Sequence, residues 1–180
     1  KNPYSASKLA QEAIATAYTA SFGLRIVVAR VFSYINPRRR NLVASSFAAQ
    51  IAEAERDGGG EIRHGSLSSI RTWCDVRDIC AAYWAASAYS SGSVCHIGSP
   101  IPISVAEILC RLLDRARVPI RLIPDPALLR PIDVRWQIPD VSDFRSKTGW
   151  NPKIGLEESL DWLLAHWRER VGTRRSDVGT

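Results

Sequence analysis

A long helical pattern runs directly into a strand pattern at the start of the chain, and this succession limits the fold more than any other feature. Asn2 can cap the helix and Pro3 suits its first position. Gly23 ends the helix, and residues 24–32 (LRIVVARVF) are branched and apolar on both faces, which is typical of a buried parallel strand. The apolar stripe of the helix consists of Leu9, Ile14, Ala17 and Tyr18. The segment predicts an α/β fold.

The rest of the chain continues the alternation. Patterns predict helices over 43–56, 76–89, 104–116, 140–148 and 156–170, with strands near 61–64, 71–74, 93–99 and 119–126. Asp75 can cap the third helix, and Ser104 with Glu107 forms a capping box for the fourth. Residues 172–180 are expected to be a disordered tail. We expect part of a doubly wound parallel sheet with a smaller α/β lobe.

Few long buried strands are present, although a parallel sheet needs neighbours on both sides of each inner strand. The chain begins with Lys1 and contains no Met among its 180 residues. We therefore expect a portion of a longer protein, with further strands upstream.

Composition excludes some classes of function. No apolar run approaches the roughly 20 residues needed to cross a bilayer, and no secretory signal is visible, so a cytoplasmic protein without membrane contact is expected. The three His residues lack ligand-like spacing, and no metal site is expected. The four cysteines, without CxxC spacing, are interpreted as buried thiols; they are Cys74, Cys80, Cys95 and Cys110.

The net charge of +6 permits a nucleic-acid partner, but the basic residues are spread along the chain and alternate with acids. Several Arg residues would also suit a small diphosphate, because the guanidinium fork matches phosphate oxygens. Nucleic-acid binding is the weaker alternative.

The stretch NPYSASK places Tyr4 and Lys8 four residues apart on the expected helix. Positions i and i+4 share a helix face, so the phenol and the ammonium can converge on one point. A nearby cation stabilises a phenolate, which suits the Tyr to proton transfer near neutrality. YxxxK alone also occurs by chance, with the Tyr in a packing role.

The context NPYSASKLAQE, followed by a strand ending in ARVFSYINP, resembles the extended short-chain dehydrogenase/reductases, which are NAD(P)-dependent nucleotide-sugar epimerases, dehydratases and reductases. The resemblance implies that Tyr4 is the acid/base and that Lys8 binds the nicotinamide ribose. It implies a Rossmann-like part at about 1–40 and 75–98, with most of the remainder to 171 forming the substrate lobe. Val31 and Phe32 would line the cofactor site, and Ser33 the substrate site.

The segments IRHGSLSSIRTWCDVRDICAAYW and DPALLRPIDV are similar to those of GDP-sugar enzymes in that family. The resemblance assigns Arg130 to the substrate diphosphate and Asp133 to the ribose diol, with Arg71 as a second phosphate or ribose contact. Asn41 corresponds to a position that contacts the diphosphate near a helix N-terminus. From the residues alone, Arg130 could be a solvated loop residue and Asp133 a turn former.

Two further readings stay open. Arg71 could pair with Asp75 or Asp78 instead of a phosphate. Ser33 stands where the family usually has Asn, and its shorter hydroxyl can donate or accept one hydrogen bond but cannot make both of the bonds that Asn makes.

The reaction favoured by the resemblance is NAD(P)H-dependent reduction of GDP-4-keto-6-deoxy-mannose at C4, with GDP-mannose 4,6-dehydratase and nucleotide-sugar 4-epimerase as alternatives. The glycine-rich dinucleotide fingerprint of the family is absent, so the chain alone should bind the dinucleotide weakly. A noncatalytic nucleotide-sugar-binding fragment is therefore the alternative of another class. The family also implies a homodimer through the Tyr–Lys helix.

Overall fold

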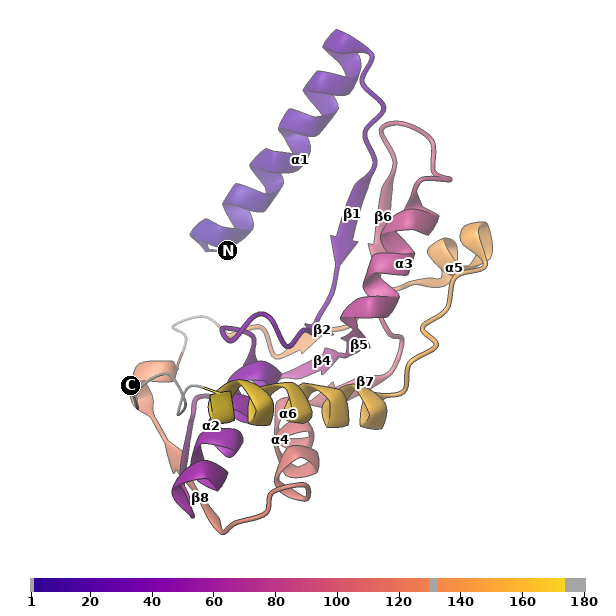
Figure 1. The fold of residues 1–180 in the computed structure, drawn as a ribbon. Coiled ribbons are helices and arrows are strands. Elements are labelled where there is room, and N and C mark those ends of the chain that lie inside the picture. The colour runs from indigo at the N-terminus through magenta and orange to yellow at the C-terminus, as the bar shows by residue number, and fades with distance from the viewer. Residues whose placement is uncertain (1, 130–132, 174–180) are drawn as a thin grey trace.

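Helices and strands alternate along the chain in the expected order (Figure 1). The computed structural model describes residues 2–129 and 133–173. The helices are α1 (Pro3–Phe22), α2 (Val43–Asp57), α3 (Val76–Ala86), α4 (Val105–Leu113), the 3-10 helix η1 (Pro126–Leu128), α5 (Ser142–Thr148) and α6 (Leu156–Thr173). The strands are β1 (Val28–Val31), β2 (Tyr34–Ile35), β3 (Gly60–His64), β4 (Ile70–Thr72), β5 (Cys74–Asp75), β6 (Val94–Ile97), β7 (Pro102–Ser104), β8 (Ile120–Pro124) and β9 (Trp136–Gln137).

Most strand pairs are parallel, as the alternation predicts. β1 pairs with β6, β2 with β5 and β3 with β8, each in parallel. β4 lies between β7, which is antiparallel to it, and β9, which is parallel. The mixed α/β class is confirmed.

The first helix has the expected ends. The Asn2 side chain accepts a hydrogen bond from the Ser5 backbone N–H at 2.8 Å, with Pro3 at the first helical position. Gly23 ends the helix in the left-handed region at φ 64°, where glycine carries no Cβ penalty.

The apolar stripe of α1 is not buried within the chain. Leu9, Ile14 and Tyr18 are 64%, 57% and 49% exposed, and no residue of α1 is buried. Helix α1 stands apart from the other helices, alongside the β1 segment (Figure 1), so the described part of the chain leaves this stripe uncovered.

The first strand is shorter and less buried than predicted. It covers Val28–Val31 rather than 24–32, and its residues are half-buried or exposed. The reason is its position: in the described residues it pairs with β6 alone, so one edge and part of its faces stay open.

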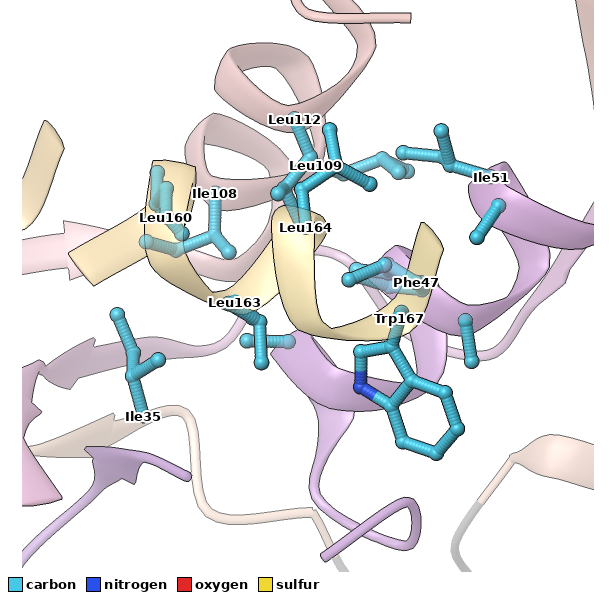
Figure 2. Close-up of a cluster of buried hydrophobic side chains, with 14 of the residues drawn as sticks. Ile35, Phe47, Ile51, Ile108, Leu109, Leu112, Leu160, Leu163, Leu164 and Trp167 are labelled. Atoms are coloured by element: carbon cyan, nitrogen blue, oxygen red, sulfur yellow. The ribbon is translucent and has the colours of Figure 1, made fainter. Parts of the chain in front are cut away.

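The larger hydrophobic core lies between α2, α4 and α6 (Figure 2). Leu160, Leu163, Leu164 and Trp167 repeat at helical spacing on α6 and face the apolar side chains of the other two helices. Helix α2 adds Phe47 and Ile51, and α4 adds Ile108, Leu109 and Leu112.

A second core forms around β6, α3 and α5. Phe144 stacks on Tyr89 and meets Trp150 edge-on, with ring centroids 5.8 and 5.5 Å apart. The Trp150 indole N–H donates to the Asp78 carbonyl at 3.2 Å. Gly149 thus ends α5, and Trp150 directly after it packs in this core.

Some boundaries and burial predictions were wrong. Helix α3 ends at Ala86 rather than near residue 89, and α6 runs through Gly172 and Thr173, which the sequence assigned to the tail. Cys80 and Cys110 are exposed because they lie on the outward faces of α3 and α4. Residues 174–180 lie outside the described part of the chain.

Three short strands, β2, β7 and β9, were not predicted. Two or three residues are too few to show a period. No described helix combines the length and apolar content needed to span a membrane.

Candidate functional site

Tyr4 and Lys8 occupy one face of the first turns of α1, as their spacing predicts. The Lys8 Nζ atom lies 5.6 Å from the centroid of the Tyr4 ring and donates to the Gln11 side-chain oxygen at 3.1 Å. Tyr4 is 70% exposed. The ammonium thus lies against the phenol ring.

Helix α1 and strand β1 run in opposite directions (Figure 1). The N-terminal end of the helix, which carries Tyr4, therefore points the same way as the carboxyl end of the strand. Glu12 and Arg30 join the two elements, with Nε–Oε1 and Nη2–Oε2 distances of 2.8 and 2.6 Å. The hydrogen bond from Arg30 holds the pKa of the Glu12 carboxyl below its usual range.

The carboxyl end of β1 continues into the residues assigned to the cofactor and substrate. Val31 is the last residue of the strand, and the Phe32 N–H extends the ladder by donating to the Ile97 carbonyl at 2.9 Å. The Phe32 ring meets His96 edge-on at 5.9 Å. Ser33 follows and is half-buried. In open α/β sheets, ligands bind outside the carboxyl ends of the strands.

Arg71 and Asp133, assigned by resemblance to the nucleotide, lie together. The Arg71 Nη2 atom is 3.5 Å from Asp133 Oδ1, and the Ser69 hydroxyl donates to Asp133 Oδ2 at 2.5 Å. The Arg71 side chain is 14% exposed and that of Asp133 31%. A guanidinium and a carboxylate, both reachable from solvent, are thus brought together from segments 62 residues apart.

The alternative partners of Arg71 are engaged elsewhere. Asp75 caps α3 and accepts hydrogen bonds from the Arg77 guanidinium at 2.9 Å. The Asp78 carboxylate accepts from the Lys153 and Ile154 backbone N–H groups at 3.0 and 2.9 Å. The structure therefore pairs Arg71 with Asp133 rather than with these carboxylates.

Asn41 lies at a helix N-terminus, as the sequence suggests. It is exposed and stands two residues before Val43, the first residue of α2. The N-cap residue Leu42 supplies no side-chain acceptor, so the first N–H groups of α2 have no cap from that side chain. Arg130 lies outside the described residues.

Gly98 lies between the segment that follows β1 and strand β4. A Cβ placed on Gly98 would lie 3.2 Å from the Phe32 Cβ, 3.3 Å from Pro139 Cγ and 3.5 Å from the Thr72 hydroxyl oxygen. Thr72 directly follows Arg71 in β4. Phe32, assigned to the cofactor, and strand β4, which carries Arg71, therefore approach one another at this glycine.

Four residues of this region were not singled out from the sequence: Glu12, Arg30, Ser69 and Gly98. Arg30 had a visible signal, since it is the one charged residue between Ile26 and Ser33. Glu12 lies four residues after Lys8 on the same helix face. Ser69 lies in a run of serines, where nothing marks one hydroxyl above the others.

The described residues offer no cluster of metal ligands, and the buried Cys74 thiol is not activated. They contain no group of three or more His, Cys, Asp or Glu side chains that could hold a metal ion. Burial raises the pKa of the Cys74 thiol to about 12, so this thiol stays protonated near neutrality.

Comparison with known proteins places this geometry in a family. The family model described as GDP-mannose 4,6 dehydratase matches residues 1–162. GDP-6-deoxy-D-mannose reductase of Pseudomonas aeruginosa is 30% identical over 174 residues, covering 95% of this chain and 57% of that protein. The chain thus spans little more than half the length of this relative.

Solved structures agree with the fold. The structure of RMD from Pseudomonas aeruginosa complexed with NADPH superposes with a TM-score of 0.85 at 29% identity, over 94% of this chain and 57% of that one. UDP-glucose 4-epimerase of Thermus thermophilus in complex with NAD superposes at 0.78 with 22% identity, over 93% and 54%, which supports the fold alone.

The match covers most of the chain and includes the Tyr–Lys helix, β4 and the segment around Asp133. The chain belongs to the GDP-mannose 4,6-dehydratase family of the extended short-chain dehydrogenase/reductases, as its motifs predicted.

Proposed function

We propose that this chain supplies the substrate lobe and the Tyr–Lys acid/base pair of an enzyme that reduces GDP-4-keto-6-deoxy-mannose at C4. The observation that carries the proposal is the placement of the Lys8 ammonium against the Tyr4 ring, at the end of α1 that lies level with the carboxyl end of β1 (Figure 1). The ion pair between Arg71, in β4, and Asp133 supports a nucleotide site at that strand.

Tyr4 acts as the acid in this scheme. Its hydroxyl gives a proton to the sugar C4 oxygen as a hydride reaches the C4 carbon, so the ketone becomes a secondary alcohol. Lys8 stabilises the phenolate that remains. The exposure of Tyr4 leaves its hydroxyl free to meet a ligand that arrives at this end of the sheet.

Arg71 and Asp133 have complementary roles in holding the nucleotide. The Arg71 guanidinium can donate to a phosphate or to a ribose hydroxyl, and the Asp133 carboxylate can accept from the ribose diol; the bidentate contact with the diphosphate is proposed for Arg130. Asn41, beside the N-terminus of α2, and Arg130 complete the proposed contacts, while Ser33 contacts the sugar.

The residues also fit a nicotinamide cofactor, NAD or NADP. An ammonium and a phenol on one helix face match a ribose diol, and Val31 and Phe32 offer apolar surface at the strand end. The reduced cofactor would supply the hydride. NADPH is favoured because the similar structure from Pseudomonas aeruginosa is complexed with NADPH.

The reductase is preferred to its alternatives because GDP-6-deoxy-D-mannose reductase of Pseudomonas aeruginosa is 30% identical to this chain. The matching family model carries the description GDP-mannose 4,6 dehydratase, which keeps that reaction as the second candidate. A 4-epimerase would use Tyr4 for a transient oxidation of the same carbon.

A noncatalytic nucleotide-sugar-binding role would need only Arg71, Asp133 and Asn41, and would leave Tyr4 without chemistry. A homodimer through the exposed face of α1 and a cytoplasmic location stay predictions.

Product analysis of the complete protein that contains this chain tests the proposal. We expect conversion of GDP-4-keto-6-deoxy-mannose and NADPH to a GDP-6-deoxy-hexose with one equivalent of NADPH consumed. Conversion of GDP-mannose to the 4-keto sugar without net cofactor consumption would support the dehydratase instead. Binding of the GDP-sugar with no turnover of either substrate would support the noncatalytic role.

A further inference from the structure

The ion pair between Glu12 and Arg30 joins the Tyr–Lys helix to the strand beside it. Two parallel hydrogen bonds of 2.8 and 2.6 Å connect the guanidinium to both carboxylate oxygens. Among the residues that the structure describes, no other hydrogen bond or ion pair connects α1 to another helix or strand.

Apolar packing within the chain does not fix this helix. No residue of α1 is buried, and its stripe of large apolar side chains is exposed. A bidentate pair between an Arg and a carboxylate has a defined planar geometry, so it restrains rotation of the helix about its axis as well as its distance from the strand.

The spacing of the pair matches that of the proposed site. Tyr4, Lys8 and Glu12 follow one another at four-residue intervals and lie on one face of α1. Tyr4 is eight residues before Glu12, or about 12 Å along the helix axis. Ser33 is three residues after Arg30, or about 10 Å along the chain in extended form.

The segment from Glu12 back to Tyr4 and the segment from Arg30 on to Ser33 extend in the same direction, because α1 and β1 are antiparallel (Figure 1). With Glu12 held at Arg30, the Tyr4 hydroxyl comes level with the segment that follows β1. A sliding of the helix by one turn would move Tyr4 by about 5 Å away from that level.

We infer that Glu12 and Arg30 are positioning residues. They set the rotation of helix α1 about its axis and its position along strand β1, and so the placement of Tyr4 and Lys8. The inference rests on the proposed role of Tyr4 and adds two residues that contact neither the sugar nor the reacting atoms. Their effect should fall on the chemical step, because the proposed nucleotide contacts lie elsewhere: Arg71 belongs to β4, in a different sheet from β1, and Asp133 pairs with it there.

The test uses the complete protein and compares Glu12→Gln, Arg30→Gln and the exchange Glu12→Arg with Arg30→Glu. Glu61→Gln is the matched control, since it breaks an exposed ion pair with Arg121 in the sheet formed by β3 and β8. Each protein is assayed for kcat, KM and hydrogen exchange of the α1 amides.

Each single substitution should lower kcat by about 10- to 100-fold, the size expected for an acid displaced by about 1 Å. KM for the nucleotide sugar should stay within about twofold, and the exchange of charges should restore kcat by about fivefold or more over either single variant. The α1 amides should exchange faster in Glu12→Gln than in Glu61→Gln.

Two outcomes separate this inference from the proposed function. A kcat of Glu12→Gln within about twofold of the unmodified protein, with Tyr4→Phe inactive, would overturn the positioning role and leave the proposed function standing. If Tyr4→Phe stays fully active, the proposed function fails. Hydrogen exchange of the α1 amides then tests the role of the Glu12–Arg30 pair by itself. Unchanged exchange in Glu12→Gln would overturn the positioning role, and faster exchange would support it.

Discussion

The Ser69 hydroxyl donates to Asp133 Oδ2 at 2.5 Å, while Oδ1 of the same carboxylate faces the Arg71 guanidinium at 3.5 Å. Ser69 is 4% exposed. The buried Ser69 hydroxyl therefore holds Oδ2 of the Asp133 carboxylate, and the other oxygen, Oδ1, lies on the solvent-exposed side of the site.

Replacing Ser69 by Ala should weaken nucleotide binding, because the Asp133 carboxylate loses the bond that orients it. We expect a loss of about 3- to 10-fold in affinity for GDP, the equivalent of one hydrogen bond, measured by calorimetric titration of the complete protein. Ser68→Ala is the control, because Ser68 is exposed and its hydroxyl, within the described residues, has a hydrogen bond with the Ser66 hydroxyl alone. Equal affinities for the two variants would contradict this role.

Glu55 ties α2 to α6 and makes stability depend on pH. Burial by itself raises the pKa of the Glu55 carboxyl, but hydrogen bonds from the Arg168 side chain and the Arg117 backbone N–H outweigh burial and leave the pKa below the ordinary value. The Arg168 bonds are both 2.7 Å long.

Since the folded pKa of Glu55 is lowered, its contribution is complete above the ordinary value of 4.5 and is lost as pH falls through the folded value. Glu55→Gln should lower the free energy of unfolding by about 2 kcal/mol at pH 7. The difference should shrink below pH 4. Urea unfolding at both pH values measures this, with Glu61→Gln as the exposed control; a difference that persists undiminished at low pH would contradict the assignment.

Gly98→Ala should disturb the junction between Phe32 and Thr72. The new Cβ would lie 3.2 Å from the Phe32 Cβ and 3.3 Å from Pro139, closer than most packed contacts. We expect a loss of about 1–3 kcal/mol in unfolding free energy, as for other overpacked sites. Gly155→Ala, which meets nothing within 4 Å, should leave stability nearly unchanged. A stable Gly98→Ala protein would show that the junction can relax.

The cysteines should separate into two classes on alkylation of the native protein. Cys80 and Cys110 are exposed, whereas Cys74 and Cys95 are buried. Burial also raises the pKa of both buried thiols, which suppresses the reactive thiolate. Mass spectrometry after brief treatment with iodoacetamide should find label on the first two alone, and labelling of Cys74 at a similar rate would be inconsistent with the fold.

Much of the architecture follows from local patterns. The caps at Asn2, Asp75 and Ser104 and the stop at Gly23 were visible because each satisfies or ends a helix through its own side chain or its freedom at positive φ. The apolar spacing of α6 likewise predicted a buried face.

Long-range relationships were not predictable from the residues alone. The pairing of Arg71 with Asp133 depends on which segments become neighbours in the fold, and Asp75 and Asp78, which lie much nearer to Arg71 in the sequence, were plausible partners as well. The exposure of the α1 stripe depends on what lies opposite it, which a helical period does not reveal. The roles of Tyr4, Lys8, Asn41 and Asp133 came from family resemblance and remain predictions.

The most direct test of the account is the rate of NADPH oxidation by the complete protein with GDP-4-keto-6-deoxy-mannose, compared between the unmodified enzyme and Tyr4→Phe. Tyr18→Phe, which removes a phenol from the same exposed helix, is the control. We expect a loss of at least about 100-fold for Tyr4→Phe alone, as when a general acid is removed. A Tyr4→Phe rate within about twofold of the control would contradict it.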